Sequence, residues 1–150
     1  MTLPCDRVFP LSRARVLLVE DDDELRAVIA ACLAAAGFEV IEASDGEGFI
    51  DRLTETLTAG SGRAFDVILS DIQLPTFSAL DVLVSAHSLI GQTPVVLLTG
   101  FGDPRTHENA LLRGATMVLD KPVRMALLCE TVANLLALAR AGSPSVATAL

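Results

Sequence analysis

Four short apolar runs, each followed by a polar residue, constrain the fold of this 150-residue chain more than any other feature. They are residues 16–19 before Glu20 and Asp21, 67–70 before Asp71, 95–98 before Thr99, and 117–120 before Lys121. Between them, apolar residues recur at helical spacing. Strands that alternate with helices predict βαβ units and a parallel sheet. In such a sheet the carboxyl ends of the strands share one edge, where ligands bind.

The full pattern predicts an α/β fold of the flavodoxin-like class. We expect strands at about residues 15–19, 38–42, 66–70, 94–98 and 116–119, with helices at about 25–36, 45–58, 80–91, 104–114 and 124–139. Strict alternation suggests a five-stranded parallel sheet of order 2-1-3-4-5 with helices on both faces. The switch point then lies between the first and third strands, which places Glu20 and Asp21 beside Asp71.

Helical periodicity also predicts which residues face the core. The expected inward residues are Leu25, Val28, Ile29, Cys32, Leu33 and Ala36, then Phe49, Ile50, Leu53 and Leu57, then Leu127, Leu128, Thr131, Leu135 and Leu138. Gly37 supplies the first helix stop. The length favours one domain over 15–139, with an N-terminal arm at 1–14. We expect the last helix to end at residues 141–144, leaving 140–150 as a flexible tail with no output domain.

Composition excludes several classes of protein. The chain is 51% hydrophobic, but no apolar run approaches the roughly 18 residues of a membrane span, and residues 1–15 do not form a secretory signal. A net charge of −8 argues against direct nucleic-acid binding through a basic face. Cys32 and Cys129 lack metal-ligand spacing and are interpreted as small buried hydrophobes, which favours a cytoplasmic location. His87 and His107 are expected to be solvated or packed, without acidic partners.

The polar residues at the strand ends predict a site for a divalent cation and a phosphoryl group. Crowded acids repel each other by about 4 kcal/mol for a pair about 4 Å apart at an effective dielectric of 20, and Lys121 or a bound cation would offset that cost. Structural alternatives stay open for single residues: Asp22 and Asp23 would meet the dipole of a starting helix, Thr99 would be strand filler, and Lys121 and Pro122 would form an exposed turn.

Four motifs together resemble the receiver domain of two-component response regulators (CheY-like). They are Val-Leu-Leu-Val-Glu-Asp-Asp at 16–22, Asp-Val-Ile-Leu-Ser-Asp-Ile-Gln-Leu-Pro at 66–75, Leu-Leu-Thr-Gly-Phe-Gly-Asp at 97–103, and Gly-Ala-Thr-Met-Val-Leu-Asp-Lys-Pro at 114–122.

The resemblance covers roughly residues 14–139 and implies a role for each site residue. Asp71 would accept phosphate from a histidine kinase or phosphotransfer protein. Glu20, Asp21, Asp71 and the backbone carbonyl of Gln73 would arrange Mg²⁺. Thr99 would bind a phosphoryl oxygen and Lys121 would pair with the phosphate. The chain would then be no enzyme beyond its own aspartyl phosphorylation and dephosphorylation.

Three departures from the family pattern concern signal output and phosphate lifetime. The family usually has an aromatic residue where this chain has Val118, so no large ring can rotate there. It often has an Asp-Gly pair at the place of Ser78 and Ala79, so a conformation easiest for glycine is lost or shifted. Phe101 is expected to overhang the site and limit the access of water.

The leading hypothesis is a stand-alone phosphorylatable switch with a downstream protein target. A homodimer through the fourth helix, fifth strand and fifth helix is a further expectation. The first alternative is a pseudo-receiver that serves as a constitutive interaction module, which the absence of an aromatic at Val118 leaves open. The second is the receiver part of a longer DNA-binding regulator. The third is a hydrolase of the haloacid-dehalogenase type, which has a second Asp where this chain has Gln73.

Overall fold

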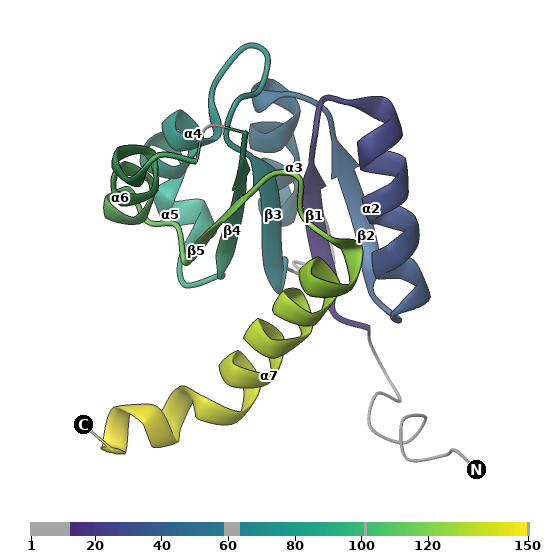
Figure 1. Cartoon of the computed structure of the whole chain (residues 1–150). Coiled ribbons are helices and arrows are strands. Elements are labelled where there is room, and N and C mark those ends of the chain that lie inside the picture. Colours follow the sequence, from purple (N-terminus) through teal and green to yellow (C-terminus); the bar gives the residue numbers. More distant parts are fainter. Residues whose placement is uncertain (1–12, 59–63, 101, 150) are drawn as a thin grey trace.

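The computed structural model describes residues 13–58, 64–100 and 102–149. Its strands are β1 (Arg15–Val19), β2 (Glu39–Ala43), β3 (Val67–Asp71), β4 (Val95–Thr99) and β5 (Met117–Asp120). They form one parallel sheet in the order β2-β1-β3-β4-β5, shown in Figure 1. This confirms the predicted fold class, and each strand begins and ends within one residue of its predicted bounds.

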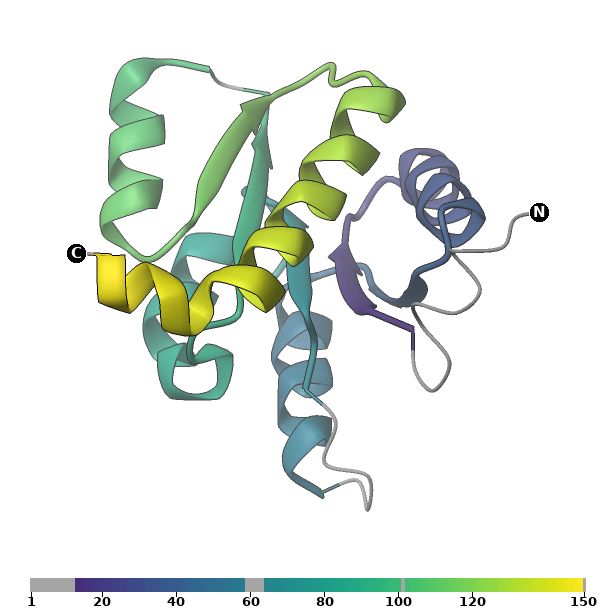
Figure 2. The ribbon, with the colours of Figure 1, turned by 90° about the horizontal axis from the view of Figure 1, so that it is seen from below.

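Helices cover both faces of the sheet. Helices α2 (Asp23–Ala35) and α7 (Met125–Ala149) pack on one face, with Ile29, Leu33 and Leu128 against alternate strand residues. The other face carries α3 (Gly46–Thr58), α4 (Ala79–Ser85), α5 (His87–Ile90) and α6 (Pro104–Leu112). Figure 2 shows α3 on the opposite side of the strands from α2 and the first turns of α7. Strands β3 and β4 are buried at every position, as expected of strands covered on both faces.

Two helix boundaries differ from the sequence expectation. The predicted third helix is divided into α4 and α5 at Ala86, whose φ of −108° and ψ of 23° depart from helical values. Helix α7 does not end at residues 141–144 but continues to Ala149. Pro144 thus lies inside a helix, although a proline there lacks a backbone donor and its ring crowds the preceding turn. Figure 1 shows the last turns of α7 beyond the edge of the sheet.

The helix faces were predicted too broadly. Five residues expected inside are exposed: Ala36, Val28 (52%), Leu57 (68%), Leu127 (42%) and Leu138 (67%). Each lies at the rim of an apolar stripe, whose centre is occupied by residues such as Ile29, Phe49, Leu128 and Val132. Cys32 and Cys129 are half-buried rather than buried. Across the described part of the chain, none of the helices combines the length and apolarity needed to cross a membrane.

Candidate functional site

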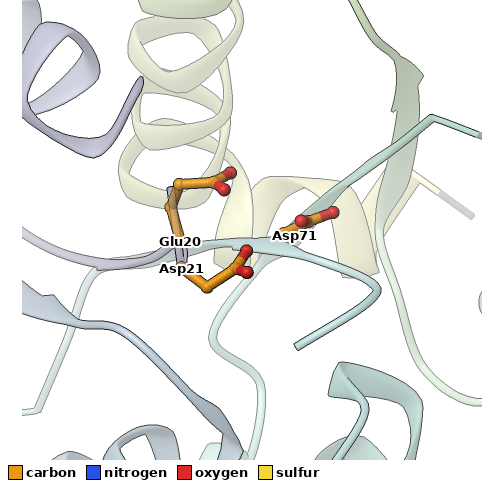
Figure 3. A group of neighbouring side chains, drawn as sticks. All are labelled: Glu20, Asp21 and Asp71. Atoms are coloured by element: carbon orange, nitrogen blue, oxygen red, sulfur yellow. The ribbon is translucent and has the colours of Figure 1, made fainter. Parts of the chain in front are cut away.

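Three carboxylates meet at the carboxyl edge of the sheet. Glu20 and Asp21 follow β1, and Asp71 is the last residue of β3. Because β1 pairs with β3, with Val19 opposite Ser70, the two strand ends lie side by side. Figure 3 shows the three side chains converging, and one oxygen from each lies within 4.8 Å of the others. The topology therefore gathers the predicted acids as the sequence indicated.

Lys121 bridges the two deeper acids. Its Nζ lies 3.2 Å from Glu20 Oε1 and 3.2 Å from Asp71 Oδ2. Its backbone N–H donates a 2.7 Å hydrogen bond to the carbonyl of Thr99, which fixes the start of the loop after β5. Lys121 is thus an ion-pair partner inside the acidic group, and the exposed-turn alternative does not describe it.

The acids differ in depth. Glu20 is 1% exposed and Asp71 is 7% exposed, whereas Asp21 is exposed at the mouth of the group. Thr99 is buried at the end of β4. The exposed Gln73 lies beyond β3, and its backbone N–H hydrogen-bonds the carboxylate of Asp71. A ligand would reach Asp71 past Asp21 and the loop that carries Gln73.

Burial dominates the ionisation of the group. Desolvation raises the pKa of Glu20, and the charge of Asp71 adds to this, although hydrogen bonds from Asp22 and Lys121 act in the opposite direction. Desolvation likewise raises the pKa of Asp71 against the opposing effect of Lys121. Burial alone would lower the pKa of Lys121, but the nearby charges of Asp71 and Glu20 outweigh it and raise that pKa. Three carboxylates share one ammonium, so negative charge remains in excess.

Backbone and arginine contacts position Glu20, and the sequence analysis missed them. The N–H of Asp22 donates to Glu20 Oε2 at 3.1 Å, and Arg26 Nη1 donates to the carbonyl of Glu20 at 2.8 Å. Arg26 also pairs with Asp23 at 2.9 Å and with Glu42 at 3.1 Å. Nothing in the sequence distinguishes Arg26 from an ordinary surface residue of a helix.

The acidic run divides into site and helix cap. Asp22 is the N-cap of α2 and accepts a 3.0 Å hydrogen bond from the N–H of Leu25. Asp23 lies in the first turn and pairs with Arg26 rather than capping. The structural interpretation therefore holds for Asp22 and Asp23, while Asp21 belongs to the acidic group.

The prediction that His107 lacks an acidic partner is wrong. Its Nε2 lies 2.8 Å from Oδ1 of Asp120, the last residue of β5. Gly102 lies so close to the same carboxylate that a Cβ at this position would be 2.5 Å from Asp120 Oδ1. The pair joins α6 to the residue that precedes Lys121. Sequence spacing could not reveal it, because it depends on how α6 packs beside β5.

The loop after Asp71 has Ser78 and Ala79 where the family often has an Asp-Gly pair. Thr76 has a φ of 72°, so the left-handed conformation occurs at Thr76 rather than at Ser78 or Ala79. Ser78 instead caps α4 in a reciprocal capping box with Asp81. The left-handed residue of this loop is thus Thr76, and Ser78 precedes a helix. Phe101, expected to overhang the site, lies outside the described residues.

The donor set matches a small divalent cation. Mg²⁺ prefers oxygen ligands, and one or two carboxylates together with waters are enough to hold it. Glu20, Asp21 and Asp71 supply only oxygen, and Lys121 leaves their charge partly uncompensated.

Comparison with known proteins places this geometry in a family. The family model of the response regulator receiver domain matches residues 16–133. The chain belongs to this family. The receiver domain is 33% identical over 121 residues to the two-component response regulator-like protein APRR5 of Arabidopsis thaliana, covering 79% of this chain and 21% of that protein. It is 34% identical over 108 residues to the transcriptional regulatory protein CpxR of Escherichia coli K12, covering 72% and 43%.

Solved structures agree with the assignment. The chemotaxis response regulator CheY4 of Vibrio cholerae superposes with a TM-score of 0.72 at 28% identity, covering 83% of this chain and 99% of that one. The receiver domain of the hybrid histidine kinase CckA gives a TM-score of 0.66 at 31% identity, covering 82% and 99%. This receiver domain spans less than half of the length of APRR5 and CpxR, but nearly all of the two solved chains.

Proposed function

We propose that this receiver domain accepts a phosphoryl group on Asp71 from a histidine kinase or phosphotransfer protein and thereby switches its interaction with a downstream protein. The carrying observation is the position of the Asp71 carboxylate, 7% exposed at the end of β3, in contact with Lys121 and grouped with Glu20 and Asp21. A carboxylate of this kind can act as a nucleophile and form an acyl phosphate.

The side chains divide the work of the transfer. A carboxylate oxygen of Asp71 attacks phosphorus, and the bond from phosphorus to the donor nitrogen breaks. Lys121 pairs with the phosphoryl group, and the hydroxyl of Thr99 binds one of its oxygens. Glu20, Asp21, Asp71 and the carbonyl of Gln73 would hold Mg²⁺, which would supply positive charge to the phosphoryl oxygens. The chain then catalyses only its own aspartyl phosphorylation and dephosphorylation and is not otherwise an enzyme.

We further propose a cytoplasmic location, because a histidine kinase donates its phosphate there. The face formed by α6, β5 and α7 is the proposed surface for a downstream target or a second copy. Leu111 (49%) and Leu112 (79%) are exposed on α6. They line one hollow with Pro104 and His107, and contiguous exposed apolar surface marks protein contacts.

Two alternatives are less well supported. Val118 is half-buried and carries no ring, but the intact group of Glu20, Asp21, Asp71 and Lys121 argues against a pseudo-receiver that binds partners constitutively. The receiver domain covers 21% of APRR5 and 43% of CpxR, so the receiver part of a longer regulator is the other alternative. The hydrolase alternative has no support, because Gln73 occupies the place of the second Asp and the family is that of receiver domains.

Intact mass after incubation with acetyl phosphate and Mg²⁺ tests the proposal. We expect one phosphoryl adduct on the wild-type chain and none without Mg²⁺ or in Asp71→Asn. Asp66→Asn is the matched control: it removes an acid whose carboxylate accepts from the N–H of Arg15 outside the acidic group, and it should keep the adduct. An adduct that persists in Asp71→Asn, or its absence from the wild type, would contradict the proposal.

A further inference from the structure

Two cysteines far apart in the sequence face each other across two helices. Cys32 lies on α2 and Cys129 on α7, which pack together on one face of the sheet. The side chain of Cys129 lies near enough to Cys32 for the two thiols to interact. Independently, Cys32 Sγ lies 3.9 Å from the carbonyl oxygen of Met125, one helical turn before Cys129. Helical side chains lean toward the N-terminus, so the Cys129 side chain points toward the turn that Cys32 contacts.

Both sulfur-bearing residues are half-buried and are not sealed in the core. Small oxidants can therefore reach them, whereas a fully buried cysteine behaves as an inert hydrophobe. Neighbouring thiols on two packed helices meet the first requirement of a disulfide, which is closeness of the two cysteines. In a reducing compartment such bonds are transient and regulatory.

We propose that Cys32 and Cys129 are a redox-modification site that forms a reversible disulfide between α2 and α7. With a low-molecular-weight disulfide as oxidant, the Cys32 thiolate attacks one sulfur and expels a thiolate, which leaves a mixed disulfide on Cys32. Cys129 loses its proton to water, and its thiolate attacks the Cys32 sulfur and expels the second thiolate, which takes up a proton from water. Overall the two cysteines lose two electrons and two protons, and the oxidant is reduced to two thiols.

The order of attack follows from the state of Cys129. Burial, together with the interaction with the Cys32 thiol and its charge, raises the pKa of the Cys129 thiol to about 12. Cys129 is therefore a poor nucleophile for the first step, and it acts in the second step through the small fraction present as thiolate. The second step should be slow and should accelerate as the pH rises.

The crosslink would join the helices that begin at the acidic group. Helix α2 starts just after Asp21, and α7 starts just after the loop that follows Lys121. A groove of about 350 Å³ lies beside the start of α2 and the loop that leads into α7, lined by Leu25, Leu98, Lys121, Pro122 and Val123. A disulfide below this groove would fix its walls relative to each other. The inference is independent of phosphoryl transfer to Asp71.

The test uses the full chain with Cys5→Ser, because Cys5 is the third cysteine and lies outside the described residues. After treatment with oxidised glutathione, we expect a monomer lighter by two hydrogen atoms, a Cys32–Cys129 linked peptide in a non-reducing digest, and full reversal by dithiothreitol. The same chain with Cys129→Ser should stop at one stable glutathione adduct on Cys32.

A second measurement follows the fold. The oxidised monomer should melt at a higher temperature than the reduced one, because the crosslink constrains the unfolded chain. Glutathione adducts on Cys32 or Cys129 that never resolve, disulfides only between two chains, or no reaction up to about pH 9 would each overturn the proposal.

Discussion

Asp21 and Asp23 carry the same charge but have different roles. Asp21 belongs to the acidic group, and Asp23 pairs with Arg26. Asp21→Asn removes a charged oxygen from the proposed Mg²⁺ site. We expect the Mg²⁺ dissociation constant to rise on the order of tenfold and phosphorylation by acetyl phosphate to slow in parallel. Titration calorimetry measures the first effect and intact mass the second.

Asp23→Asn is the charge-matched control for this variant. It weakens one surface ion pair, worth about 0.5 kcal/mol of unfolding free energy, and should leave Mg²⁺ affinity nearly unchanged. Equal losses of affinity in the two variants would mean that Asp21 acts only through general negative charge.

Asp71 should destabilise the metal-free fold. Its pKa is raised, mainly by burial, so the folded chain holds the proton more tightly than the unfolded chain does. Stability is therefore lost as the pH rises from the ordinary Asp range through the raised pKa, and the penalty is complete above it. Asn cannot ionise, and Lys121 keeps its 3.2 Å contact with Glu20. In a chelator Asp71→Asn should be more stable by about 1 kcal/mol.

Thermal melts of the two chains at about pH 4 and about pH 8 measure this difference, since the ordinary pKa of Asp lies near 4. The advantage of Asp71→Asn should grow with pH, and adding Mg²⁺ should shrink it because the ion stabilises the wild type. A constant difference in melting temperature across this range, or a less stable variant, would contradict the assignment of a strained carboxylate.

Neighbouring leucines of helix α7 differ in burial, because only one of them lies at the middle of the helix's apolar face. Leu128 is fully buried against the sheet, while its neighbour Leu127 is 42% exposed. Leu128→Ala leaves a cavity and should lower the free energy of unfolding by about 2–4 kcal/mol. Leu127→Ala removes the same atoms from a half-solvated position and should cost less than about 1 kcal/mol. Urea denaturation distinguishes them, and similar losses would show that the two residues are equally buried in solution.

Strand elements were predictable because a parallel sheet covered on both faces needs uninterrupted apolar runs, as in β3 and β4. The acidic group followed from the strand order, since Glu20 and Asp71 end neighbouring strands. The helix faces were less predictable, because apolar residues such as Val28 also occur at the rim of a stripe. The end of α7 was missed because glycine and proline usually end a helix, whereas α7 continues through Gly142 and Pro144.

Contacts that depend on packing between elements were not predictable. His107 and Asp120 meet because α6 lies beside β5, and Cys32 meets Cys129 because α2 lies beside α7. Arg26 reaches the carbonyl of Glu20 through its rotamer rather than through any pattern in the sequence. The spacing of residues along the chain does not predict such contacts between elements. In contrast, strand order alone determines which residues meet at the carboxyl edge of the sheet.

At the scale of the whole molecule, a path without an aromatic ring connects the site to the α6 face. Thr99 and Asp120 are partners in the β4–β5 register, and the carbonyl of Thr99 accepts from the N–H of Lys121. Asp120 in turn holds His107 of α6 at 2.8 Å. A movement of Thr99 toward a phosphoryl group would therefore shift Asp120 and, through it, α6. Val118 takes no part in these contacts.

Amide exchange with and without beryllofluoride, a phosphoryl mimic, tests this path. We expect the amide-exchange protection to change at Thr99, along α6 and in β5. The change should be modest, because only the difference in the mimic's interaction with the two states shifts the equilibrium. His107→Ala should keep the change near Asp71 and Thr99 while reducing it along α6. Protection confined to residues 71–77, or an α6 response unaltered by His107→Ala, would show that the signal leaves the site by another route.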